Sequence, residues 1–184
     1  MPSFALTRSR SAAWVSSLPT QAKTFGRQWA THLKTHWFAY LLAVVCVEML
    51  SANYTLGINA TPSLPQKLFV IHKHAPVRLG DYAAFKPPPE AGFDSRAILT
   101  KIVAGVEGDH VVQQDRMVFV NGVPVGYAKE RSLKGAPLEP VRSAVIGRNE
   151  IYVRGLHKDS LDSRYAMVGL LTPDRMIGRA YPLW

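Results

Sequence analysis

The sequence predicts a mainly β, partly barrel-shaped body behind one N-terminal apolar helix. Short apolar or alternating runs follow one another from residue 66 onward, and Gly, Pro and Asn residues separate them. Such spacing is typical of an all-β domain. A single long apolar run near the N-terminus predicts the helix. About 47% of the 184 residues are hydrophobic, which is enough for an ordinary folded core.

The apolar run extends over residues 37–58 and contains one charged residue, Glu48. A membrane-spanning helix needs about 20 mostly apolar residues. Trp37 and Tyr40 at one end and Tyr54 near the other fit aromatic anchors at the two membrane interfaces. We therefore expect residues 37–58 to form a retained transmembrane anchor.

The basic residues are unevenly distributed. The net charge is +9, and residues 1–36 carry five basic residues and no acidic one. Positive charge ahead of an apolar run predicts a basic cytoplasmic tail over 1–36 and a periplasmic domain over 59–184 at the bacterial inner membrane. It favours the lipid bilayer over nucleic acid as the partner. A buried core helix and a cleaved signal peptide are the alternatives for the run, and the long basic flank disfavours both.

Five segments of the predicted periplasmic domain have strand patterns, and a sixth segment predicts a hairpin. In the hairpin, Asn121-Gly122 lies between alternating apolar residues, the pattern of a type I′ turn. A helical pattern occurs only near residues 163–171. The expected strands are residues 67–72, 82–85, 97–105, 110–114 and 150–155, with the hairpin at 117–126.

Lys101 is flanked on its own strand face by Leu99 and Val103, because side chains alternate along a strand. A buried lysine here would have a lowered pKa, because burial disfavours the charged ammonium, and its amine could act as a general base. From this segment alone, however, a lysine at a sheet edge that reaches water is the favoured interpretation. Ser63, held between Pro62 and Pro65, is a candidate nucleophile if a base lies beside it, and an ordinary loop residue if none does.

Other hydrolytic and metal signatures are missing from the sequence. No G-x-S-x-G or H-E-x-x-H motif is present. His72 and His74 would share one face of a strand, but no third ligand is evident. The single cysteine, Cys46, lies in the apolar run and allows neither an intramolecular disulfide nor a cysteine-based metal site.

Three segments, in this order behind an N-terminal anchor, resemble the bacterial type I signal peptidases. They are TPSLP (61–65), LTKIVAGVEGD (99–109) and DSLDSR (159–164). Gly80-Asp81 with Phe85 resembles the G-D-x-x-x-F element of the same family. The resemblance implies a membrane-bound serine peptidase that uses a Ser–Lys dyad and needs neither metal nor cofactor.

The resemblance also implies a role for each matching residue. Ser63 matches the nucleophile and Lys101 the general base. The Thr61 hydroxyl matches a group that forms the oxyanion hole with the Ser63 N–H. Ser160 matches a serine that orients the lysine. The residues that brace this region are Asp162 and Arg164.

The S-x-P spacing at Ser63 and the H-x-D-S-x-D-S-R pattern from His157 resemble the TraF-type conjugative-transfer peptidases. That branch implies maturation of a conjugative pilin precursor, with the precursor polypeptide and the transfer apparatus as partners. There are three alternatives to this function: a general signal peptidase, a transpeptidase that cyclises the pilin, and a non-catalytic scaffold of the transfer apparatus. A self-cleaving Ser–Lys repressor would need a DNA-binding domain where the apolar run stands.

Overall fold

The computed structural model describes residues 20–184, and the expected tail over residues 1–36 lies partly outside this range. The chain divides into an N-terminal helical unit, which ends at Met49, and a β unit, which begins at Leu50. Helix α2, Thr20–Asn53, has a kink at His36, where φ is −112° and ψ is 17°. Its segment Phe25–Asn53 is long and apolar enough to cross a membrane, and none of its most apolar window is buried in the protein.

The helix ends at Asn53, five residues before the expected end of the anchor. Tyr54–Ile58 instead forms strand β1, which pairs antiparallel with β2, Leu68–Lys73. The composition favours a strand, because Tyr, Thr and Ile are good strand formers and the side chains alternate. Gly57 pairs with Phe69, and a Cβ at this position would lie 2.8 Å from the terminal methyl carbon of Ile71, so a larger residue would displace that side chain.

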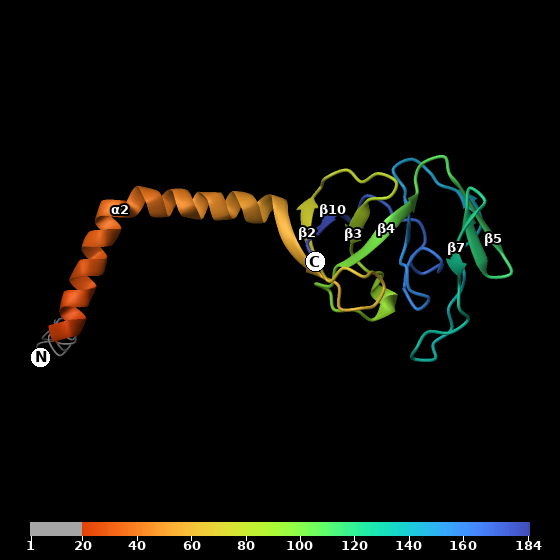
Figure 1. Cartoon of the computed structure of the whole chain (residues 1–184), viewed down its shortest axis with the longest axis horizontal. Helices are drawn as coiled ribbons and strands as arrows, with labels where there is room; N and C mark the ends of the chain where they lie inside the picture. The colour runs from red at the N-terminus through yellow and green to blue at the C-terminus, as the bar shows by residue number, and fades with distance from the viewer. Residues whose placement is uncertain (1–19) are drawn as a thin grey trace, which may run out of the picture. The chain divides into compact units, whose positions relative to one another are not determined.

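The larger sheet has six antiparallel strands in the order β1-β2-β10-β3-β4-β9 (Figure 1). Strands at 67–72, 82–85, 97–105 and 150–155 were expected, and the structure confirms all four. Strand β10 was not expected, although it lies in the middle of the sheet. The remaining strands of this sheet are β3 Tyr82–Phe85, β4 Leu99–Gly105, β9 Tyr152–Arg154 and β10 Met176–Pro182.

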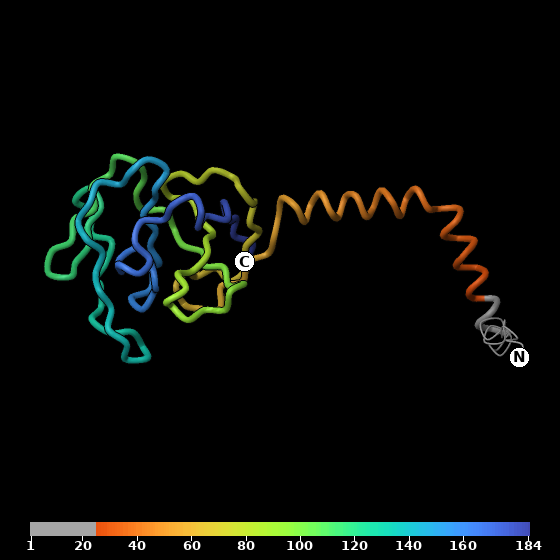
Figure 2. Tube along the Cα trace, turned by 180° about the vertical axis from the view of Figure 1, so that it is seen from behind, coloured from red at the N-terminus to blue at the C-terminus, as the bar shows by residue number. Residues whose placement is uncertain are grey.

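The smaller sheet has four strands in the order β7-β6-β5-β8. The predicted hairpin is confirmed, with Asn121 and Gly122 both at positive φ between β6 and β7. The segment that follows β7 projects from the β body in both views (Figures 1 and 2). The strands of this sheet are β5 His110–Gln114, β6 Met117–Val120, β7 Val123–Tyr127 and β8 Ala144–Val145.

The expected helix near residues 163–171 is wrong, because that segment forms turns. Its backbone is drawn into tertiary hydrogen bonds: the Ser163 N–H donates to the Val153 carbonyl, and the Ala166 N–H donates to the Glu139 carbonyl. Gly169 has a φ of +59°, which ends any helical run. The apolar residues of the segment join the core beneath the larger sheet.

Candidate active site

A short loop between β1 and β2 holds Ser63 and is organised around the side chain of Asn59. The amide nitrogen of Asn59 donates to the carbonyl oxygens of Leu64 and Gln66, at 3.2 and 3.1 Å. Its amide oxygen accepts from the Thr61 N–H, at 3.3 Å. This last bond spans two residues, which is the pattern of an Asx turn. One side chain therefore fixes the backbone on both sides of Ser63.

The Ser63 hydroxyl is buried, with 2% of the residue exposed. It lies 2.9 Å from the Thr61 hydroxyl and donates to the Asn59 amide oxygen at 3.3 Å. The neighbouring Leu64 packs into a core cluster with Phe69 and Ile71. The loop is thus pinned to the sheet, and the hydroxyl has a defined set of partners.

Lys101 lies on β4, between β3 and β9, and is 3% exposed, so the sheet-edge lysine favoured by the local segment is wrong. Burial lowers the pKa of Lys101 from its ordinary value of 10.5 to about 8. The negative charge of Asp162 acts in the opposite direction, and the positive charge of Arg164 lowers the pKa further. A lysine at this pKa is neutral in about one molecule in ten at pH 7, which suits a general base.

Gly155 is the point where three segments of the site meet. The register of β4 and β9 pairs Ile102 with Arg154, so Lys101 and Gly155 are each the neighbour of a residue in that pair. A Cβ on Gly155 would lie 2.0 Å from the Ser160 hydroxyl oxygen and 3.1 Å from the Ser63 carbonyl oxygen. Since no side chain fits there, glycine permits the close approach of the segments that carry the lysine and both serines.

Two hydrogen bonds hold this junction. The Leu156 N–H donates to the Ser63 carbonyl oxygen at 2.8 Å. The Gly155 N–H donates to Asp162 Oδ2 at 2.7 Å. The loop that holds Ser63 is therefore attached directly to the segment that follows β9.

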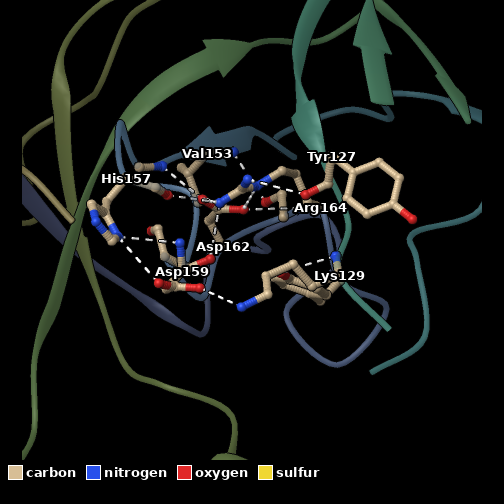
Figure 3. A network of polar contacts seen from close by, with 11 residues as sticks. Tyr127, Lys129, Val153, His157, Asp159, Asp162 and Arg164 are labelled. Carbon is tan, nitrogen blue, oxygen red and sulfur yellow. Dashed lines mark hydrogen bonds and ion pairs between the residues drawn. The ribbon is translucent and has the colours of Figure 1, made fainter. Parts of the chain in front are cut away.

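Asp162 and Arg164 form a buried ion pair that shapes residues 155–164 (Figure 3). Arg164 Nε lies 2.8 Å from Asp162 Oδ1, and Nη2 lies 3.0 Å from Oδ2, so the pair is bidentate. The same guanidinium donates to the carbonyl oxygens of His157 and Ser160. Charge-assisted bonds in this geometry are strong and directional, which fixes the loop around the junction.

The predicted site residues thus lie in one region. The hydroxyl groups of Ser63 and Ser160 differ in their hydrogen bonding. Within residues 20–184, the Ser63 hydroxyl is hydrogen-bonded to Thr61 and Asn59 and forms no hydrogen bond with Lys101. The Ser160 hydroxyl is buried without a hydrogen-bond partner in the same part of the chain. A buried hydroxyl of this kind is available to a neighbouring amine.

The histidine pair considered as a metal site is not arranged as one. His72 lies on β2 and stacks on Tyr54, with ring centroids 4.7 Å apart. His74 lies beyond the strand in a left-handed conformation. Among the described residues, no group of three or more His, Cys, Asp or Glu side chains is placed to hold a metal ion.

Comparison with known proteins identifies the class. A family model described as "Signal peptidase, peptidase S26" matches residues 29–184. The chain therefore belongs to this family of serine peptidases. A solved structure of a signal peptidase I from Enterococcus faecalis V583 is 19% identical, covers 56% of this chain and 96% of its own, and gives a TM-score of 0.35. The search of curated proteins gave no significant match.

Two features of the site were not predicted from the sequence. Asn59 stands at the start of NATPSLP, and its tendency to bond its own backbone two residues on was the available signal. Gly155 opens the segment GLHKDSLDSR, but its importance depends on the closeness of Ser63 and Ser160, which only the folded chain shows.

Proposed function

We propose that this protein is a membrane-anchored serine endopeptidase with Ser63 as nucleophile and Lys101 as general base. The observation that carries the proposal is a lysine that is 3% exposed, has a pKa near 8, and directly precedes Ile102, which pairs with Arg154 at the end of β9. A structural lysine would gain nothing from this burial. An amine that must be neutral to accept a proton gains the unprotonated fraction it needs.

In the proposed mechanism the neutral Lys101 amine takes the proton of the Ser63 hydroxyl while its oxygen attacks the scissile carbonyl carbon. The tetrahedral intermediate collapses, the C–N bond breaks, and the Lys101 ammonium returns the proton to the leaving amine. Lys101 then deprotonates the water that hydrolyses the acyl-enzyme. The Ser160 hydroxyl, which is buried without a partner among the described residues, orients the lysine amine.

The oxyanion hole is proposed to consist of the Ser63 N–H and the Thr61 hydroxyl. Thr61 Oγ1 lies 2.9 Å from Ser63 Oγ, so a modest rotation directs it toward an oxygen on the attacked carbon. A preorganised donor of this kind lowers the barrier by about 3 kcal/mol in other serine enzymes. The buried Asp162–Arg164 pair keeps the surrounding loop in place.

We further propose a precursor of a conjugative pilin as the substrate, processed at the periplasmic face of the bacterial inner membrane with the N-terminus in the cytoplasm. The S-x-P spacing and the H-x-D-S-x-D-S-R pattern favour this substrate. The family match favours a second candidate, removal of signal peptides from exported proteins in general.

The test is co-expression of the full chain with a pilin precursor, and separately with a general secretory precursor, followed by the intact mass of each product. Wild type is expected to process the pilin precursor, and Ser63→Ala is expected to leave it intact. A linear mature mass indicates hydrolysis, whereas a mass lower by one water indicates cyclisation. Equal processing by Ser63→Ala would overturn the assignment and favour a scaffold.

A further inference from the structure

A cavity of about 510 Å³ lies between the end of β7 and the segment after β9. Its volume is within the range of about 300–1,000 Å³ that ligand pockets occupy. Four of the residues that line it are basic: Lys129, Arg154, Lys158 and Arg164. No acidic residue is among the lining residues, although two carboxylates outside the lining, Asp159 and Asp162, pair with lining cations.

Two of these cations are already neutralised. Arg164 is held by Asp162, and Lys129 Nζ lies 2.5 Å from Asp159 Oδ1 (Figure 3). The Lys129 hydrogen bond lowers the pKa of Asp159, so that carboxylate is ionised and the pair is complete at neutral pH. Because the charges within each of these two pairs cancel, neither Arg164 nor Lys129 offers a net positive charge to a ligand.

The other two cations remain for a ligand. Arg154 is half-buried and Lys158 is exposed, and neither forms a hydrogen bond or an ion pair within residues 20–184. With two carboxylates against four cations, the cavity keeps a net charge of +2. The adjoining hollow around Lys129 contains both Glu130 and Arg131, so its own charges largely cancel. The excess positive charge is therefore concentrated in the part of the cavity that Arg154 and Lys158 line.

The cavity also begins next to the nucleophile. Gly155 and Leu156 form part of its wall, and the Leu156 N–H is the group that binds the Ser63 carbonyl oxygen. A polypeptide whose scissile bond reaches Ser63 must pass close to this segment. A residue of that polypeptide a few positions from the cut is within reach of the cavity, since an extended chain advances about 3.3 Å per residue.

Resting on the proposed peptidase function, we propose that this cavity binds a carboxylate of the precursor near the scissile bond, held by Arg154 and Lys158. The carboxylate comes from an Asp or Glu side chain or from the end of the precursor chain. Arg154 supplies a planar fork suited to two carboxylate oxygens, and Lys158 supplies a mobile second charge. The site would make the enzyme selective for precursors with an acidic residue on one side of the cut.

The test uses the full chain in neutral detergent and peptides spanning the cleavage site, in matched forms with Glu or Gln near the cut and with a free or amidated C-terminus. Wild type is expected to cleave the preferred acidic form with a kcat/KM about 5–20 times that of its neutral partner, chiefly through KM. One carboxylate contact of about 1–2 kcal/mol corresponds to that ratio. In Arg154→Gln/Lys158→Gln the ratio is expected to fall toward one. Lys134→Gln, an exposed lysine outside the cavity, should keep the wild-type ratio.

Binding of the same labelled peptides to Ser63→Ala, measured by anisotropy, separates this inference from the peptidase assignment. Discrimination of acidic from neutral peptide in binding supports the cavity even if no peptide is cleaved. Cleavage or binding that ignores the carboxylate in wild type overturns the cavity proposal and leaves the dyad intact. If the double variant instead loses only its binding to phosphatidylglycerol vesicles, the cavity holds a lipid headgroup and the proposal is wrong.

Discussion

Replacing Lys101 with Met removes a buried amine and keeps most of the side-chain volume. The pKa of Lys101 is lowered from 10.5 to about 8, chiefly by burial. At about 1.4 kcal/mol per pKa unit, the ammonium form destabilises the folded state by about 3 kcal/mol relative to the neutral form. Lys101→Met should therefore unfold at a higher temperature than wild type at pH 7, although it should lose its activity.

The sign of the pH dependence follows from the same pKa. Between pH 8 and 10.5 the unfolded chain holds a proton on this lysine that the folded chain has released, so the stability of wild type rises with pH in that window. Lys101→Met lacks this rise. Its advantage should be largest below pH 8, at about 6–12 °C in melting temperature for a chain of this size, and should shrink toward pH 10.5.

The assay is thermal unfolding of the full chain in neutral detergent at pH 6 to 10, followed by near-ultraviolet circular dichroism. Lys134→Met serves as the matched control, because Lys134 is exposed and its loss should change little at any pH. Equal melting temperatures for Lys101→Met and wild type at pH 7 would refute the reasoning. They would indicate that Lys101 reaches water and carries no burial penalty.

Four further predictions concern the same site. Cleavage by wild type should rise about tenfold per pH unit below pH 8 and level off above it, and a flat kcat/KM between pH 6 and 9 would contradict a base with this pKa. Asn59→Ala should lower kcat about 10- to 100-fold with a smaller effect on KM, because the Ser63 loop loses its central support; an unchanged kcat would show that the loop holds itself. Arg164→Met should destabilise the β body by about 3–5 kcal/mol in denaturant melts, since it leaves Asp162 buried and unpaired; a loss under 1 kcal/mol would show that water reaches the carboxylate. Gly155→Ala should abolish cleavage and lower the melting temperature, because its Cβ would strike the Ser160 hydroxyl; full activity would mean that the segments separate easily.

Local patterns predicted those parts of the fold that depend on local chemistry. Alternation around Lys101 predicted its strand and the face that it shares with Leu99 and Val103, because neighbouring residues on one strand determine both. The burial of Lys101 was not predicted by this segment, because it depends on the strands β3 and β9 that pair with β4 on either side. The Asn121-Gly122 turn fixed its hairpin for the same reason, since few residues tolerate two successive positive φ values.

Features that depend on distant contacts were not predictable in this way. β10 is interrupted by Gly178 and ends in Pro182, so it looks weak by itself, yet β2 and β3 pair with it on both sides. The apparent helix at 163–171 fails because the backbone N–H groups of Ser163 and Ala166 donate to carbonyl oxygens of distant segments. Gly155 owes its role to the Ser63 and Ser160 segments, which meet there only after folding.

The most direct test of the central claim, that Lys101 acts on the group at position 63, is a thiol titration. Ser63→Cys is introduced into a Cys46→Ala background, which removes the single native cysteine, and the rate of alkylation is followed against pH. With Lys101 present, its charge should lower the pKa of the introduced thiol by at least about one unit relative to the same protein carrying Lys101→Met. Coincident titration curves for the two proteins would contradict the dyad.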